Sequence, residues 1–346
     1  MTAAPPKAPQ HEVSMGSTII RSRTFSPAFS CGMTLLRPEA LSVPSASALD
    51  RFYFPLDGGF MKFGVLPFIS ESSARPDAVA RKCEELGFES FWLPEHAIIP
   101  VKHKTPYPMG DGTIPEPYAH IIDPFVGLGI AGAVTSKIML GTGICLVPER
   151  DPIVCAKEVA TVDHFSGGRF LFGIGAGWLR DETEIMGVEF KQRWPMTRDY
   201  IRAMKELWTK PEPSYEGPFV KFPPVKSYPK PMQKPYPPII IGAGGIGRPN
   251  DRAIADTVAI GDGWAPIMMT PEQLKPELEK LHKKCAEAGR DYRKIDITMF
   301  SPIPGSDAHA SIREYERAGV HRVVLFPECA PDKYQRELED LARAWM

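Results

Sequence analysis

From Met61 onward the chain alternates short apolar segments with helical segments, and it does so eight times. The apolar segments are rich in β-branched and aromatic residues, as expected of strands buried on both faces. They comprise residues 62–68, 90–93, 138–144, 169–174, 238–242, 263–266, 295–300 and 321–326. Eight such units predict one α/β domain over residues 61–346, a (β/α)8 TIM barrel, with an open doubly wound sheet as the alternative.

The expected helices fill the gaps between these strands. Asp-Pro pairs at 123–124 and 151–152 mark two helix starts, because the missing N–H of proline needs no partner there. The other helices are expected at 76–87, 196–209, 250–259, 271–288, 308–318 and 332–345. Two long insertions remain, one after strand 2 (94–123) and one before strand 5 (210–237), where a small hairpin over 215–222 is plausible.

Residues 1–60 differ in composition from the rest of the chain. They hold seven Pro and twelve Ser or Thr and show no sustained hydrophobic period, so we expect a disordered N-terminal extension. A targeting peptide is the alternative, which the acidic residues among them disfavour.

Composition excludes several classes of protein. Lys and Arg number 41 against 42 Asp and Glu, so no basic surplus points to nucleic acid or an anionic membrane. No apolar stretch approaches the roughly 18 residues of a membrane span, and we expect a cytoplasmic protein. Six cysteines without a C-x-x-C pair fit reduced thiols, and no metal site is expected.

Glu95 and His96 follow the second expected strand and open the first insertion. A carboxylate beside an imidazole can transfer protons at a substrate hydroxyl or carbonyl near neutral pH. Because neighbouring residues on an extended strand point to opposite sides, we expect one of the two to face a ligand. The same insertion lies where barrel active sites lie, and it supplies Tyr107, Tyr118 and His120 as candidate pocket residues.

Two glycine-rich segments end later strands. Gly173, Gly175 and Gly177 alternate at the fourth strand, where they leave room either for a flat ligand or for tight packing. The segment 242–247 satisfies G-x-G-x-x-G, but it lacks the acidic partner of a dinucleotide fold. It can form an anion site at a helix N-terminus or a plain tight turn.

Ordered motifs resemble the luciferase-like monooxygenase superfamily, and within it the coenzyme F420-dependent oxidoreductases. They are Glu-Leu-Gly-Phe-Glu-Ser-Phe-Trp-Leu-Pro-Glu-His at 85–96, Leu-Gly-Thr-Gly-Ile at 140–144, and Ser-Gly-Gly-Arg at 166–169 leading to Gly-Ala-Gly-Trp at 175–178. The resemblance spans about 62–330 and implies a (β/α)8 barrel that binds F420 or a flavin at its carboxyl face.

The resemblance also assigns expected roles to residues. His96 would lie near the reactive carbon of the cofactor, with Glu95 beside it. The third strand would bend under the cofactor ring at Gly143 and Ile144, often through a cis peptide. Backbone contacts along the cofactor are expected at Gly175, Ala176 and Gly177, and its phosphate is expected at Gly244 and Gly245. Trp178 replaces an acidic residue of the sugar-phosphate dehydrogenases, so it is expected to shape the substrate pocket instead.

The expected function is hydride transfer between coenzyme F420 and a small organic substrate. The alternatives are a monooxygenase that uses FMNH2 and O2, and a non-catalytic flavin-binding barrel. In each enzymatic case the cofactor carries out the redox chemistry while the protein positions it and excludes water. The partner is a small molecule, and a homo-oligomer is left open.

The extension should be dispensable for folding, because it offers too little apolar surface to offset the entropy of ordering it. A chain that begins at Met61 should therefore fold with the thermal stability of the full chain. An insoluble or clearly less stable shortened chain would show that the boundary is misplaced.

Overall fold

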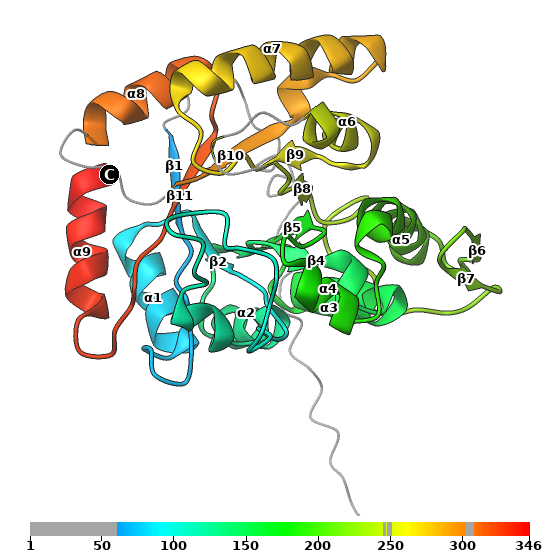
Figure 1. Ribbon diagram of the computed structural model, residues 1–346, viewed down its shortest axis with the longest axis horizontal. Helices are drawn as coiled ribbons and strands as arrows, with labels where there is room; N and C mark the ends of the chain where they lie inside the picture. Colours follow the sequence, from blue (N-terminus) through cyan, green and yellow to red (C-terminus); the bar gives the residue numbers. More distant parts are fainter. Residues whose placement is uncertain (1–60, 245–246, 248–250, 302–307) are drawn as a thin grey trace, which may run out of the picture. The chain divides into compact units, whose positions relative to one another are not determined.

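The computed structural model describes residues 61–244, 247, 251–301 and 308–346 (Figure 1). The expected N-terminal extension, residues 1–60, lies outside the described residues. Eleven strands belong to the described part of the chain. They are β1 (Lys62–Val65), β2 (Ser90–Leu93), β3 (Met139–Thr142), β4 (Cys145–Leu146), β5 (Phe170–Gly175), β6 (Tyr215–Glu216), β7 (Lys221–Phe222), β8 (Ile239–Ile241), β9 (Gly263–Trp264), β10 (Asp296–Phe300) and β11 (Arg322–Leu325).

Parallel pairing closes eight of these strands into a barrel. The order β3-β2-β1-β11-β10-β9-β8-β5 is closed by the pairing of β3 with β5. The short strand β4 continues β3 after a break at residues 143–144 and pairs with β5 again. The prediction of a (β/α)8 barrel is therefore confirmed, each expected strand is present, and the open doubly wound sheet is wrong.

Helices surround the barrel strands (Figure 1). They are α1 (Pro76–Leu86), α2 (Pro124–Val134), α3 (Pro152–Phe165), α4 (Arg180–Ile185), α5 (Arg193–Thr209), α6 (Asp251–Ile260), α7 (Pro271–Glu287), α8 (Ala308–Ala318) and α9 (Tyr334–Trp345). Both Asp-Pro signals are confirmed, since Asp123 and Asp151 accept backbone N–H bonds at the starts of α2 and α3. Helix α4 was not predicted, because six residues are too few to show a helical period.

The insertion before β8 contains the expected hairpin. Strands β6 and β7 pair antiparallel, with Tyr215 opposite Phe222. Asp199 of α5 holds this hairpin, because its carboxylate accepts from the Tyr215 hydroxyl at 2.7 Å and from the Phe219 N–H at 2.9 Å. The insertion after β2 contains one 3-10 turn, η2 (Glu116–Ala119), and otherwise irregular chain.

The barrel interior is filled around the indole of Trp92. Trp92 is fully buried and donates to the Ser90 hydroxyl at 2.8 Å. A Cβ at Gly141 would lie 2.2 Å from this indole, and one at Gly64 would lie 2.9 Å from its nitrogen. The neighbouring strands therefore need glycine at both positions. The other fully or nearly buried members of this inner cluster are Leu66, Leu171, Ile240, Ala265, Phe300 and Val324.

The Ser-Gly-Gly-Arg motif has a structural role. Arg169 is buried, and its guanidinium donates to the carbonyls of Gly132, Thr135 and Ile138 at 2.6–3.1 Å. These carbonyls lie at the end of α2 and in the turn that follows it. Because the last carbonyls of a helix lack partners within the helix, Arg169 supplies the missing hydrogen bonds and fixes α2 to the start of β5.

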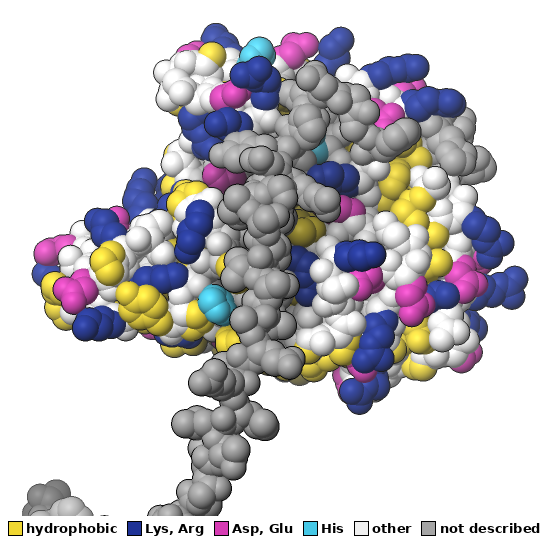
Figure 2. Space-filling model, turned by 180° about the vertical axis from the view of Figure 1, so that it is seen from behind, with side chains coloured by type: hydrophobic (Ala, Val, Ile, Leu, Met, Phe, Trp, Pro, Cys, Tyr) yellow, Lys and Arg dark blue, Asp and Glu magenta, His cyan; other side chains and the backbone are white. Residues whose placement is uncertain are grey.

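On the face shown in Figure 2, basic and acidic side chains lie among one another rather than in separate fields. Among the described residues, no helix is long and apolar enough to cross a bilayer.

A buried ion cluster lies at the amino ends of the barrel strands. Arg322 of β11 is inaccessible to solvent and donates to both oxygens of Glu89, at 2.7 and 2.8 Å. It also donates to Asp296 of β10 at 3.1 Å and to the Thr298 hydroxyl at 2.7 Å. Burial is the largest single influence and would raise the pKa of Asp296, but the charges of Arg322, His321 and Lys62 and the Thr298 hydrogen bond together lower that pKa.

Replacing Arg322 with Met should lower the free energy of unfolding by about 3–5 kcal/mol, because it removes the guanidinium that pairs with the buried Asp296 and the half-buried Glu89. The loss should be largest above the ordinary carboxyl pKa range and should shrink in acid, where the two groups are protonated. Urea denaturation at several pH values measures it.

Arg336→Met is the matched control for this experiment. Arg336 lies on α9 with its side chain 89% exposed, and its ion pair with Asp340 spans 3.9 Å. Its loss should cost less than about 1 kcal/mol. An equally small loss in Arg322→Met would show that the buried cluster contributes little to stability.

Candidate functional site

The carboxyl ends of β2, β4, β5 and β8 lie at the same end of the barrel. Strand β5 pairs in parallel with β8 and β4, and β3, which β4 continues, pairs in parallel with β2. The chain leaving β2 carries His96, and the chain leaving β5 carries Trp178. These two rings pack edge to face with centroids 5.8 Å apart. The structure therefore brings the first insertion and the fourth barrel strand together, as predicted for a site at this end of the barrel.

His96 is held by a carboxylate that the sequence did not single out. Its Nδ1 lies 2.6 Å from Oε2 of Glu182, and the two side chains are 6% and 1% exposed. The other oxygen of Glu182 accepts the Ala97 N–H at 2.9 Å and lies 3.4 Å from the Ile98 N–H. An ionised carboxylate only accepts, so Nδ1 of His96 carries the hydrogen of this bond and Nε2 is the ring nitrogen left for another partner.

Three aromatic rings enclose His96. Tyr118 lies 5.4 Å from the imidazole by ring centroids, and Tyr107 packs against both Tyr118 and Trp178. The two tyrosine hydroxyls are 2.8 Å apart and share a hydrogen bond. Burial and this hydrogen bond raise the pKa of Tyr118. The cluster therefore combines a proton-exchanging ring with apolar walls and neutral hydroxyls.

Glu95 has a different environment from its neighbour. It is buried, and its carboxylate accepts the Leu146 N–H and the Arg150 Nε, each at 2.6 Å. Arg150 also pairs with Asp123 and Glu158. This network ties the end of β2 to β4 and to helices α2 and α3. Glu95 thus organises the backbone of the site, while His96 faces the aromatic cluster.

The peptide bond between Gly143 and Ile144, at the break between β3 and β4, is cis. A Cβ at Gly143 would lie 2.5 Å from Leu66 and 3.3 Å from Phe300, so the chain passes directly over the inner cluster. The half-buried side chain of Ile144 lies against the next strands, where a Cβ at Gly175 would be 2.0 Å from its Cδ1.

Protein atoms occupy the space beside the three alternating glycines. A Cβ at Gly173 would lie 2.0 Å from the Thr142 carbonyl oxygen, and one at Gly177 would lie 2.9 Å from Glu149. Gly177 also has a φ of +78°. Close packing therefore explains why these positions are glycine. Of the two interpretations of this motif, room for a flat ligand and tight packing, the structure supports tight packing. Ala176 between them is buried.

After β8, Gly244 is exposed and has a φ of +128°. Its expected partner, Gly245, lies outside the described residues. Gly247 has a φ of +61°, and its N–H donates to the Ile267 carbonyl at 3.0 Å. Helix α6 begins at Asp251.

Three arginines lie close together near Gly177. The guanidiniums of Arg193 and Arg180 lie 3.6 and 4.7 Å from the ring centroid of Phe190. Arg193 also donates to the Gly177 carbonyl at 3.2 Å. Burial, and then the charges of Arg252 on α6 and Arg180, lower the pKa of Arg193. Positive charge therefore gathers beside the carboxyl end of β5.

Not every candidate from the sequence joins this cluster. His120 is exposed, and its two ring nitrogens lie 2.6 Å from Glu71 and 3.2 Å from Glu116. These side-chain hydrogen bonds raise the pKa of His120. The sequence analysis missed Glu182 because α4 has only six residues and His96 lies 86 residues away. It missed Arg193 because its partner, the Gly177 carbonyl, is 16 residues away along the chain.

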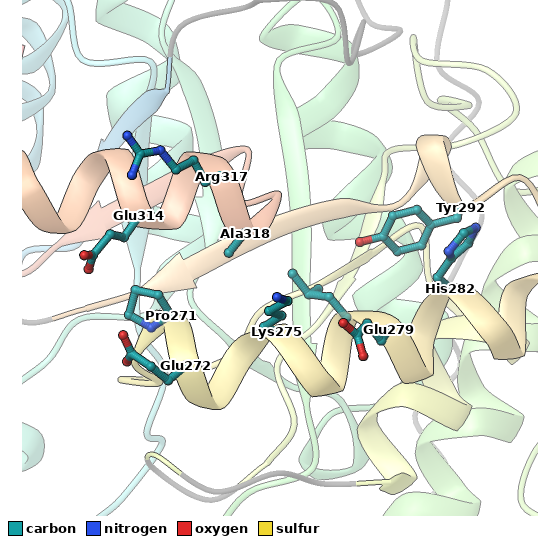
Figure 3. A pocket seen from close by; sticks show the side chains of 10 residues that line it. Pro271, Glu272, Lys275, Glu279, His282, Tyr292, Glu314, Arg317 and Ala318 are labelled. Carbon is teal, nitrogen blue, oxygen red and sulfur yellow. The ribbon is translucent and has the colours of Figure 1, made fainter.

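A groove of about 500 Å3 lies elsewhere, between α7 and α8 (Figure 3). Its lining includes Glu272, Lys275, His282, Tyr292, Glu314 and Arg317. None of the residues predicted for the site lines it. Among the described residues, no group of three or more His, Cys, Asp or Glu side chains is arranged to hold a metal ion.

Comparison with known proteins identifies relatives. An uncharacterized protein of Mycobacterium tuberculosis is 42% identical over 288 residues, covering 82% of this chain and 98% of that protein. An FMNH2-dependent dimethylsulfone monooxygenase of Pseudomonas putida is 30% identical over 172 residues, covering 49% of this chain and 45% of that protein.

Solved structures share the fold. An F420-dependent secondary alcohol dehydrogenase, in complex with an F420-acetone adduct, superposes with a TM-score of 0.64 at 19% identity. The match covers 83% of this chain and 100% of that chain. The luciferase-like monooxygenase family model matches residues 61–343. The protein described here thus belongs to the luciferase-like monooxygenase family of oxidoreductases.

Proposed function

We propose that this protein transfers a hydride between coenzyme F420 and a small organic substrate. The observation that carries the proposal is His96, held by Glu182 at 2.6 Å and enclosed by Trp178, Tyr107 and Tyr118. A proton-exchanging ring in an aromatic enclosure suits a hydroxyl or carbonyl substrate whose oxygen gains or loses a proton as its carbon exchanges a hydride.

The proposed cofactor has a ring and an anionic chain, and the residues expected to hold it lie at or just after the carboxyl ends of β3, β5 and β8. Bound F420 would supply the hydride carrier. Gly143 and Ile144 would support its ring, since they form the break over the inner cluster. The backbone at Gly175, Ala176 and Gly177 would follow its chain, and Gly244 with Gly245 would contact its phosphate. Arg193 and Arg180 beside Gly177 provide positive charge for such a chain.

His96 would exchange the proton at the substrate oxygen through Nε2. Its hydrogen bond from Nδ1 to Glu182 fixes both the tautomer and the ring orientation. The walls formed by Tyr107, Tyr118 and Trp178 would exclude water and shape the substrate pocket. We propose no part in this pocket for His120, because its ring pairs with surface carboxylates.

An FMNH2-dependent monooxygenase is the second candidate, supported by the similarity to the dimethylsulfone enzyme. The two candidates share the barrel and the ring site, and the cofactor distinguishes them. Separate titration of F420 and FMN into the purified protein tests the proposal: F420 should bind, and FMN binding without F420 binding would support the monooxygenase. Binding without turnover would support a non-catalytic flavin-binding barrel.

Gly244→Val should weaken F420 binding at least tenfold, about 1.4 kcal/mol, because a branched side chain would block the approach of the phosphate to the backbone. Gly289→Val is the matched control. Gly289 also has a positive φ, +66°, and lies in open space after α7, away from the site. If both folded variants bind F420 like the unchanged protein, the phosphate lies elsewhere.

His96→Ala should lower kcat by roughly 10²–10⁴, as expected for loss of a general acid-base group, with little change in F420 affinity. His120→Ala is the control in the same insertion and should keep kcat. An unaltered kcat in His96→Ala would show that His96 is not the group that exchanges the proton, and Tyr107 or Tyr118 would then be the candidates.

A further inference from the structure

A third carboxyl group lies behind the His96–Glu182 pair. Glu149 ends η3 (Val147–Glu149), the 3-10 turn directly after β4. Its Oε1 lies 2.8 Å from the hydroxyl of Thr183, the neighbour of Glu182 on α4. The turn at Gly177 makes this approach feasible, because a Cβ there would lie 2.9 Å from the same oxygen.

The hydrogen bonds around Thr183 favour a proton on Glu149. The Thr183 hydroxyl lies 2.8 Å from Glu149 and 3.1 Å from the Leu179 carbonyl, and it has one hydrogen for these two oxygens. A protonated Glu149 resolves this, because it donates to Thr183 while Thr183 donates to Leu179. With Glu149 ionised, the one hydroxyl hydrogen would be shared between Glu149 and the Leu179 carbonyl, which also accepts the Thr183 N–H at 3.1 Å.

The second oxygen of Glu149 points to the same state. Oε2 is buried and has no hydrogen-bond partner among the described residues. A negative charge without a donor is costly in such a place, whereas a neutral carboxylic acid costs less.

The charges around Glu149 act in the same direction. Burial, and then the carboxylates of Glu182 and Glu95, raise the pKa of Glu149 to about 8. Helices α3 and α5 also pack against η3, and no described group on them contributes to this shift. The Thr183 hydrogen bond opposes the shift without cancelling it.

We propose that Glu149 is a neutral carboxylic acid in the working enzyme and a positioning residue that acts on His96 through Glu182. With Glu149 neutral, the Glu182 carboxylate accepts the hydrogen of His96 Nδ1 with one oxygen and the Ala97 N–H with the other, with no second carboxylate charge from Glu149. With Glu149 ionised, a second negative charge would lie close to Glu182 and change the electrostatic field at His96. The effect on His96 rests on the proposed function, whereas the proton on Glu149 does not.

Stability measurements test the proton. Because the folded-state pKa of Glu149 is raised from 4.5 to about 8, its ionisation in the unfolded chain destabilises the fold increasingly between these two pH values. Glu149→Gln mimics the neutral acid and removes this penalty. Its urea midpoint should therefore exceed that of the unchanged protein by a margin that grows with pH across this interval and is constant above it.

Glu184→Gln is the matched control, since Glu184 lies on α4 with its side chain 52% exposed. Its midpoint should stay close to that of the unchanged protein throughout. A difference for Glu149→Gln that is independent of pH, or a uniform loss of stability, would overturn the proton assignment.

Spectroscopy tests the coupling without any cofactor. The unchanged protein should show an infrared carbonyl band of a protonated carboxylic acid at neutral pH, which disappears above pH 8 and is absent in Glu149→Gln. The NMR signals of the His96 ring should shift over the same pH interval, and only when Glu149 is present. A band without this shift would overturn the positioning role. Failure of F420 to bind would instead contradict the proposed function and leave the proton assignment intact.

Discussion

The fold depends on a buried arginine at the place where the two ends of the barrel meet. Strand β11 pairs with β1 along four residues, and Arg322 lies opposite Lys62 at the start of that ladder. A buried guanidinium is tolerable only when its donors are satisfied, and here Glu89 and Asp296 supply the acceptors. Glu89 directly precedes β2, and Asp296 is the first residue of β10. The cluster therefore specifies which strands are neighbours when the barrel closes.

The space above this cluster determines the form of the site. Trp92 fills the barrel, and glycine at Gly64 and Gly141 gives its indole room. Gly143 then crosses above Leu66 and Phe300. A ligand at the carboxyl ends of the strands would consequently rest on a solid apolar floor rather than enter the barrel. The chemistry is confined to the loops, as is usual for this architecture.

Charge is divided between two neighbouring carboxylates in that floor. Glu95 pairs with Arg150 and fixes the backbone of β4, whereas Glu182 holds His96 and the Ala97 N–H. In the Glu-His motif, Glu95 therefore fixes the backbone of the site, and His96 contacts the rings of Tyr118 and Trp178. Glycine at Gly177 lets α4 approach η3, which places Glu182 and Glu149 in the same small volume.

The sequence by itself determined the repeating architecture, the helix starts at Asp123 and Asp151, and the hairpin. Each depends on local pattern or on the parallel order of strands, which are legible along the chain. Only the tertiary structure decided that Glu182 holds His96, since 86 residues separate them. It also decided that His120 pairs with surface acids and that protein atoms fill the space beside the strand glycines. Contacts of this kind depend on how distant segments pack, and no period in the sequence encodes them.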